Sequence, residues 1–178
     1  MTPARIKKLV RTIPDFPVVG VQFRDITTLL ADGEGFAATV DWLATQVERA
    51  EVQAVAGMEA RGFIFGAAVA ARMGLPFLPI RKPGKLPCET IGVDYQLEYG
   101  SDRLEMDATA IEPGTRVAIV DDLLATGGTA CAATELLRKV DAKVDNAIFV
   151  IDLPDLGGRD ALRASGITVE ALMEFEGE

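Results

Sequence analysis

The chain has 178 residues, of which 49% are hydrophobic, and this is enough apolar material for the core of one enzyme-sized domain. Its net charge of −9 and pI near 4.6 argue against a nucleic-acid partner, because an acidic surface repels phosphate backbones. The complete lack of histidine excludes Ser–His and Cys–His nucleophile pairs and every metal site that uses histidine.

The first third of the chain predicts helices around a short extended segment. The pattern favours a helix from the start of the chain to about residue 12, an extended stretch over 18–28 and an amphipathic helix over 36–50. Residues 1–10 lack the apolar stretch of a signal peptide, and no apolar run approaches the roughly 20 residues of a membrane span. We therefore expect a cytoplasmic protein without a membrane partner.

The remainder of the chain alternates strand and helix patterns without a linker. We expect strands at 52–57, 76–81, 117–120, 145–151 and 168–172, helices at 62–73, 130–140 and 155–164, a loop at 82–95, and a hairpin that joins 95–99 to 103–106. This alternation predicts an α/β fold with a mostly parallel, twisted sheet, helices on both faces and a single domain over residues 1–178. In such a sheet, ligands bind at the carboxyl ends of the strands.

Residues 117–129 are the most informative segment of the chain and read Val-Ala-Ile-Val-Asp-Asp-Leu-Leu-Ala-Thr-Gly-Gly-Thr. A buried strand ends in two carboxylates, Asp121 and Asp122, and a turn of small residues then leads into a helix. The turn offers backbone N–H groups, hydroxyls and the helix dipole to a phosphate, while the carboxylates suit a sugar diol or a hydrated Mg²⁺. The segment is neither a Walker A loop nor a Gly-x-Gly-x-x-Gly turn. It predicts a ribose 5-phosphate site. A looser version of the pattern, with only a Gly-Gly turn between a strand and a helix, would as often be purely structural as functional.

Three further segments are expected at the same edge of the sheet. Arg61 follows a strand in a small-residue turn, Arg81, Lys82 and Lys85 follow the next strand, and Glu98 stands beside an aromatic residue. Taken alone, each has an ordinary explanation as a surface turn, a solvated loop or a hairpin edge. Beside a phosphate site, the basic residues instead predict a diphosphate clamp.

The segment at 117–129 resembles the signature of the type I phosphoribosyltransferases, which use phosphoribosyl pyrophosphate. Other segments resemble one family with that fold, the adenine phosphoribosyltransferases, and the similarity covers nearly the whole chain. They are Gly-Val-Gln-Phe-Arg-Asp-Ile at 20–26, Glu-Ala-Arg-Gly-Phe at 59–63, Arg-Lys-Pro-Gly-Lys-Leu-Pro at 81–87, Tyr-Gln-Leu-Glu-Tyr-Gly at 95–100 and Ile-Asp-Leu-Pro-Asp-Leu-Gly-Gly-Arg at 151–159. Families that act on xanthine, hypoxanthine and guanine, or orotate share only the ribose-phosphate signature.

The resemblance implies an enzyme of purine salvage. Such an enzyme transfers ribose 5-phosphate from phosphoribosyl pyrophosphate to N9 of adenine and yields AMP and diphosphate. It further implies a Mg²⁺ requirement, a homodimer, a base-recognition hood within residues 1–30 and a flexible catalytic loop at 82–95. The ion is expected to bind mainly through substrate and water, with no direct protein ligand.

The resemblance also implies roles for individual residues. Asp121 and Asp122 would meet the ribose hydroxyls and favour a cationic sugar, and Glu98 would handle the proton at the imidazole ring of adenine. The 5-phosphate is assigned to Ala125, Thr126, Gly127, Gly128 and Thr129, the diphosphate to Arg61, Arg81, Lys82 and Lys85, and adenine to Gln22, Phe23 and Arg24. For Arg24, pairing with Asp25 or bracing of the fold is an equal alternative.

Two other functions fit the same residues. An enzyme with this fold could act on another base, and a non-catalytic regulator could use the fold to sense phosphoribosyl pyrophosphate or a nucleotide. The regulator is disfavoured because the chain has no room for an added DNA-binding domain and carries the wrong net charge for one. Glu98 and the basic loop also favour an enzyme. Binding of adenine rather than of other bases would discriminate between these functions.

Overall fold

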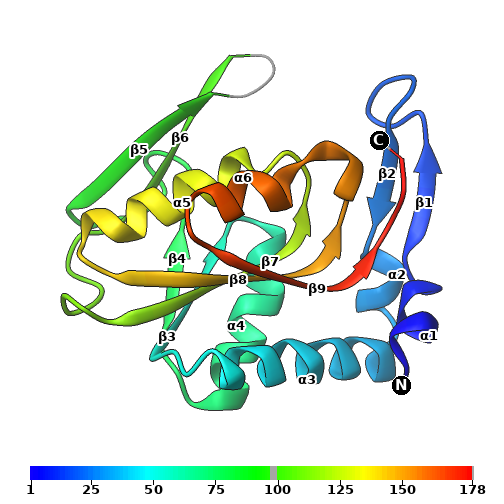
Figure 1. Ribbon diagram of the computed structural model, residues 1–178, viewed down its shortest axis with the longest axis horizontal. Coiled ribbons are helices and arrows are strands. Elements are labelled where there is room, and N and C mark those ends of the chain that lie inside the picture. Colours follow the sequence, from blue (N-terminus) through cyan, green and yellow to red (C-terminus); the bar gives the residue numbers. More distant parts are fainter. Residues whose placement is uncertain (97–99, 178) are drawn as a thin grey trace.

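The computed structural model describes residues 1–96 and 100–177, and its centre is a five-stranded sheet (Figure 1). The strands are β3 (Ala54–Met58), β4 (Phe77–Ile80), β7 (Arg116–Leu124), β8 (Lys143–Asp152) and β9 (Thr168–Glu174). They lie in the order β4, β3, β7, β8, β9, and each neighbouring pair is parallel. The predicted α/β fold with a mostly parallel sheet is therefore confirmed.

Helices cover both faces of this sheet. They are α3 (Gly33–Arg49) and α4 (Arg61–Met73) on one face, and α5 (Gly128–Lys139) and α6 (Gly158–Ala164) on the other. Successive side chains of a strand point to opposite faces, and β7 therefore contributes to both cores.

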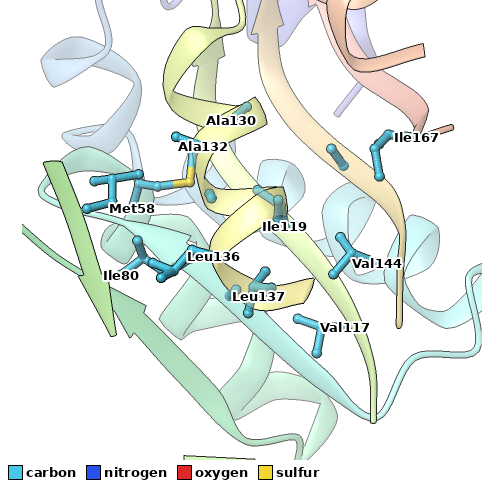
Figure 2. Close-up of a cluster of buried hydrophobic side chains, with 14 of the residues drawn as sticks. Met58, Ile80, Val117, Ile119, Ala130, Ala132, Leu136, Leu137, Val144 and Ile167 are labelled. Carbon is cyan, nitrogen blue, oxygen red and sulfur yellow. The ribbon is translucent and has the colours of Figure 1, made fainter. Parts of the chain in front are cut away.

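Successive side chains of β7 point alternately into the two hydrophobic cores. Val117 and Ile119 belong to the core beneath α5, whereas Ala118 and Val120 belong to the core beneath α3 and α4. Figure 2 shows the first of these cores, with Leu136 and Leu137 of α5 lying over the strand. The continuous apolar run at the start of β7 is explained by burial on both sides.

The helix predicted to reach residue 12 is wrong in its length. Helix α1 covers only Pro3–Lys7, and strand β1 (Arg11–Pro14) follows it and pairs antiparallel with β2 (Gln22–Asp25). The guanidinium of Arg11 donates to Asp25 at 2.5 and 3.2 Å, which fixes the register at one end of this hairpin. These contacts join positions 14 apart, so a local periodicity could not reveal them. A short helix, α2 (Thr27–Leu30), comes next.

The loop predicted at 82–95 is also shorter than expected. Strand β5 (Thr90–Gln96) already pairs with β6 (Ser101–Asp107), from Thr90 opposite Asp107 to Gln96 opposite Ser101. The hairpin has an apolar side that packs into the core beneath α5, formed by Val93, Leu104 and Met106. The glycines and prolines of the region hid this pattern in the sequence.

Strand β7 extends past its predicted end at residue 120. Its parallel partner β8 continues alongside it, so that Leu124 still pairs with Asp152. Asp121 and Asp122 therefore lie inside the strand rather than after it. A single 3-10 turn, η1 (Pro154–Leu156), leads from β8 towards α6. Within residues 1–96 and 100–177, no helix combines the length and apolar character needed to cross a membrane.

Candidate functional site

The carboxyl ends of β3, β7 and β8 border one pocket of about 770 Å³. This is the edge at which a parallel α/β sheet is expected to bind its ligands. The lining residues are Met58, Glu59, Ala60, Arg61, Gln96, Leu156 and residues 121–130. The structure thus brings together three predicted groups of site residues, namely Arg61, the acidic pair and the small-residue turn.

The small-residue turn at 125–129 connects β7 to the start of α5. Gly127 has φ of +86°, a left-handed conformation that favours glycine, and it directly precedes the first residue of α5. The first amides of this helix lack partners within the helix and carry the positive end of its dipole. Together these features make the turn suitable for binding an anion such as a phosphate.

The turn is supported from behind by the start of α6. The amide of Gly158 donates to the carbonyl of Ala125 at 3.1 Å. A Cβ placed on Gly127 would lie 3.0 Å from Cα of Gly158, and a Cβ on Gly158 would collide with the carbonyl of Ala125. Two glycines at the contact therefore let two backbone segments pack at a distance that side chains would prevent.

Asp121 and Asp122 form a crowded acidic pair at the floor of the pocket. Asp122 is buried, and Oδ1 of Asp121 accepts a hydrogen bond from the Asp122 amide at 2.8 Å. Burial and the charge of Asp122 raise the pKa of Asp121 well above its ordinary value, although part of its surface faces the pocket. Burial also raises the pKa of Asp122, and the positive charge of Arg61 opposes that rise.

Arg61 lies beside the acidic pair because α4 begins there. Its Nε is 2.9 Å from Oδ2 of Asp122, an ion pair that lacks hydrogen-bond alignment, since this oxygen is buried without a hydrogen-bond partner among the described residues. The next residue, Gly62, leaves room for Asp121, because a Cβ on Gly62 would collide with Oδ1 of that residue. The sequence Arg61-Gly62 thus places a positive charge next to one aspartate and makes space for the other.

The other predicted basic residues do not line the pocket that the described residues form. Nε of Arg81 donates to Glu59 at 2.7 Å, and Nη1 of Arg81 donates to the carbonyl of Lys85 at 3.1 Å. Lys82 is paired with Asp102 of strand β6. Of the four residues predicted to bind diphosphate, Arg61 alone belongs to the pocket lining given by residues 1–96 and 100–177.

The hairpin formed by β1 and β2 carries the three residues predicted to bind adenine. Because side chains alternate along a strand, Phe23 and Arg24 face opposite sides. The guanidinium of Arg61 lies 5.5 Å from the ring centroid of Phe23, and Phe16 makes an edge-to-face contact with the same ring at 5.1 Å. Phe23 is therefore directed towards the site, and Gln22 is half-buried beside it.

Arg24 is buried and braces the fold, in agreement with one of the two alternatives to adenine binding. Its guanidinium donates to Thr12 at 2.6 Å and to the carbonyl of Glu176 at 2.7 Å, and it lies 4.8 Å from the ring centroid of Phe175. Asp25 pairs with Arg11 instead, and hydrogen bonds from Thr27 and Arg11 lower the pKa of Asp25 to about 2.

Some site residues did not follow from the sequence, and one predicted residue has no described position. Glu98 lies outside the described residues. Glu59, Gln96 and Leu156 line the pocket without having been singled out. Leu156 follows β8, so the rule on strand ends could have indicated it, and Glu59 adjoins Arg61. Gln96 reaches the site because the β5–β6 hairpin packs against α5.

The chain is similar to known proteins both over a family domain and over its full length. Residues 27–174 match the family model described as phosphoribosyl transferase domain. The chain is 67% identical over 177 residues to a protein of Novosphingobium aromaticivorans named adenine phosphoribosyltransferase, and the match covers 99% of each chain.

Solved structures of that name have the same fold. The crystal structure of adenine phosphoribosyltransferase from Thermoanaerobacter pseudethanolicus matches with a TM-score of 0.94 at 46% identity, and covers 98% of this chain and 100% of its own. The Saccharomyces cerevisiae enzyme, complexed with D-2,5-dideoxy-2,5-imino-altritol 1,6-bisphosphate and adenine, matches with a TM-score of 0.91 at 36% identity, over 96% and 98% of the two chains.

Proposed function

Because the chain belongs to the phosphoribosyltransferase family, and within it to the adenine phosphoribosyltransferases, we propose that it transfers ribose 5-phosphate from phosphoribosyl pyrophosphate to N9 of adenine. The products are AMP and diphosphate, and the role is purine salvage. The observation that carries this proposal is that one pocket combines a turn suited to an anion, two carboxylates and Arg61. We further propose that the protein acts as a homodimer in the cytoplasm.

The two anionic ends of phosphoribosyl pyrophosphate bind to different parts of the site. The 5-phosphate binds to the amides of residues 125–129 and to the hydroxyls of Thr126 and Thr129. The diphosphate binds near Arg61, and the basic residues that follow β4 approach it from the rim. These are Arg81, Lys82 and Lys85. Fixing both ends of the sugar places its reacting carbon against the base, which is the positioning contribution to the rate.

The acidic pair stabilises the positive charge that develops on the ribose. When diphosphate leaves, positive charge forms on the ring carbon and ring oxygen of the ribose, and Asp121 and Asp122 stabilise it while their oxygens bind the ribose hydroxyls. The buried Oδ2 of Asp122 accepts no hydrogen bond from the described residues, although Arg61 lies close to it, and it is an acceptor suited to that contact. The same two carboxylates fit a hydrated Mg²⁺ held mainly by substrate and water, and a bound Mg²⁺ supplies charge neutralisation to the leaving diphosphate.

The base lies between the hood and the pocket. Phe23 supplies an aromatic wall next to Arg61, and its backbone neighbours Gln22 and Arg24 offer hydrogen-bonding groups of the main chain. Glu98 handles the proton at the imidazole ring of adenine. Since the chain has no histidine, this proton transfer falls to a carboxylate, a Lys, a Tyr or the substrate itself, and Glu98 is the carboxylate proposed for it.

The proposal is tested by product formation from phosphoribosyl pyrophosphate and Mg²⁺, with adenine, hypoxanthine, guanine, xanthine and orotate in parallel reactions. We expect AMP from adenine and no product from the other bases. Omission of the sugar donor serves as the control. Product from another base would overturn the assignment of the base site, and binding of the donor without any product would favour a regulator.

A further inference from the structure

Each of three basic residues around the site is paired with a carboxylate of its own. Arg61 pairs with Asp122 at 2.9 Å, Arg81 with Glu59 at 2.7 Å, and Lys82 with Asp102. An anionic ligand that binds to these cations must therefore share them with, or take them from, carboxylates that are already in place.

Asp102 differs from the other two carboxylates in its position. Glu59 and Asp122 line the pocket, so they are able to contact a ligand there. Asp102 stands on β6, in the hairpin that packs against α5, and does not appear in the lining formed by the described residues. Lys82 is directed towards this hairpin, and it too is absent from that lining.

Tyr95 connects this ion pair to the anion-binding turn. It lies opposite Asp102 in the β5–β6 ladder, and its hydroxyl donates to Oδ2 of Asp102 at 3.3 Å. Nζ of Lys82 donates to the same hydroxyl at 3.4 Å, and the hydroxyl of Thr129 donates to it at 3.4 Å. Lys82 is thus held beside Thr129, at the edge of the site, by two groups of the hairpin.

From this arrangement we propose that Asp102 is a positioning residue that holds Lys82 outside the pocket and lowers the affinity of the site for diphosphate. The inference rests on the proposed function, because it assumes that Lys82 is a diphosphate ligand. Asp102 competes with the diphosphate for the ammonium group, and its negative charge also repels the anion. Both effects favour release of the diphosphate product.

The test is the affinity of the full chain for diphosphate with Mg²⁺, measured by calorimetry for wild type, Asp102→Asn and Asp94→Asn. Partly exposed ion pairs contribute little, so we expect Asp102→Asn to bind diphosphate about two- to fivefold more tightly. Asp94 is the matched control, because it is an ion-paired carboxylate of the same hairpin, next to Tyr95 but on the opposite face of the strand. Asp94→Asn should change the affinity far less.

A double-mutant cycle assigns the effect to Lys82. In a Lys82→Met background, Asp102→Asn should no longer tighten diphosphate binding. An unchanged or weaker affinity for Asp102→Asn, an equal gain for Asp94→Asn, or a gain that persists without Lys82 would each overturn the proposal. AMP synthesis by the wild-type preparation tests the proposed function separately, so the two failures are distinguishable.

Discussion

At the scale of single residues, Asp121 shows a conflict between stability and function. Its carboxylate is required beside the sugar in the proposed mechanism, but burial and the charge of Asp122 disfavour its ionised form and raise its pKa. A carboxyl group whose pKa is raised on folding stabilises the fold while it is protonated. That contribution is fully present below the ordinary pKa of about 4 and is lost as the pH rises through the higher folded-state value.

Replacement of Asp121 by Asn should therefore stabilise the protein at neutral pH and abolish most of its activity. We expect the melting temperature to rise by ~2–4 °C at pH 7–8, and the gain to shrink towards pH 4, where wild-type Asp121 is protonated as well. Calorimetric melts across this range are the measurement. Asp122→Asn is the comparison, and its gain should be smaller because Arg61 loses its partner. A gain that grows towards acid pH would contradict this explanation.

The identity of the site residues was more accessible from the sequence than their contacts. Asp121 and Asp122 lie near the carboxyl end of β7, Arg61 follows β3, and parallel strands bring their ends to one edge. The contacts of Arg24 with Glu176 and Phe175 depend on chain segments about 150 positions away, and no local pattern contains that information.

At the scale of elements, the turn at 125–129 takes its shape partly from a different element. The start of α6 packs against it through Gly158, whose amide binds the carbonyl of Ala125. The turn and helix α5 were predictable because their signal is contiguous in the sequence. The support from α6 was not, because it requires two glycines, Gly127 and Gly158, to meet in space.

Replacement of Gly158 by Ala should displace the turn and weaken binding of the 5-phosphate. We expect KM for phosphoribosyl pyrophosphate to rise ~10-fold or more, because the displaced amides would bind the 5-phosphate less well, and KM for adenine to change little. Steady-state kinetics with each substrate varied provides the measurement. Gly33→Ala is the matched control, since an added methyl there meets nothing within 4 Å. Equal increases in both KM values would point to general destabilisation instead.

At the scale of the whole molecule, the two ends of the described chain combine into one unit. The family match covers residues 27–174, and both the β1–β2 hairpin and residues 175–177 lie outside it. The C-terminal segment contacts both the hairpin and α1: Arg24 of the hairpin and Lys7 of α1 lie over the ring of Phe175, at 4.8 and 4.6 Å from its centroid. In Figure 1 the red C-terminal segment runs beside the blue hairpin. The sheet thus belongs to the part of the chain that matches the whole family, and the hairpin with its C-terminal support is the part proposed to select the base.

Residues 175–177 also contact β8 and the η1 turn, and they thereby link the hairpin to the edge of the sheet at which the site lies. The amide of Phe175 donates to the carbonyl of Asp152 at 3.0 Å, and the amide of Gly177 donates to Asp155 at 2.8 Å. Truncation after Glu174 should therefore loosen the hairpin. We expect KM for adenine to rise ~5-fold or more, with a smaller change in KM for phosphoribosyl pyrophosphate.

Kinetics with each substrate varied will check this prediction, with Lys8→Ala as the control at an exposed position near the hairpin. Arg24→Ala should reproduce the effect of the truncation, because it removes the hydrogen bond to Glu176 from the other side. An unaltered KM for adenine in both variants would show that the hairpin is held in place without this segment.

The contact between Arg24 and Glu176 also has a consequence for biosynthesis. The two residues are 152 positions apart, so a ribosome makes the hairpin long before it makes the segment that holds it. The sheet and its anion-binding turn are translated between the two. During translation, the hairpin of the nascent chain therefore cannot form its contact with Glu176 until the sheet has been synthesised. Selection of the base should accordingly be acquired only after the sheet and the turn have been made.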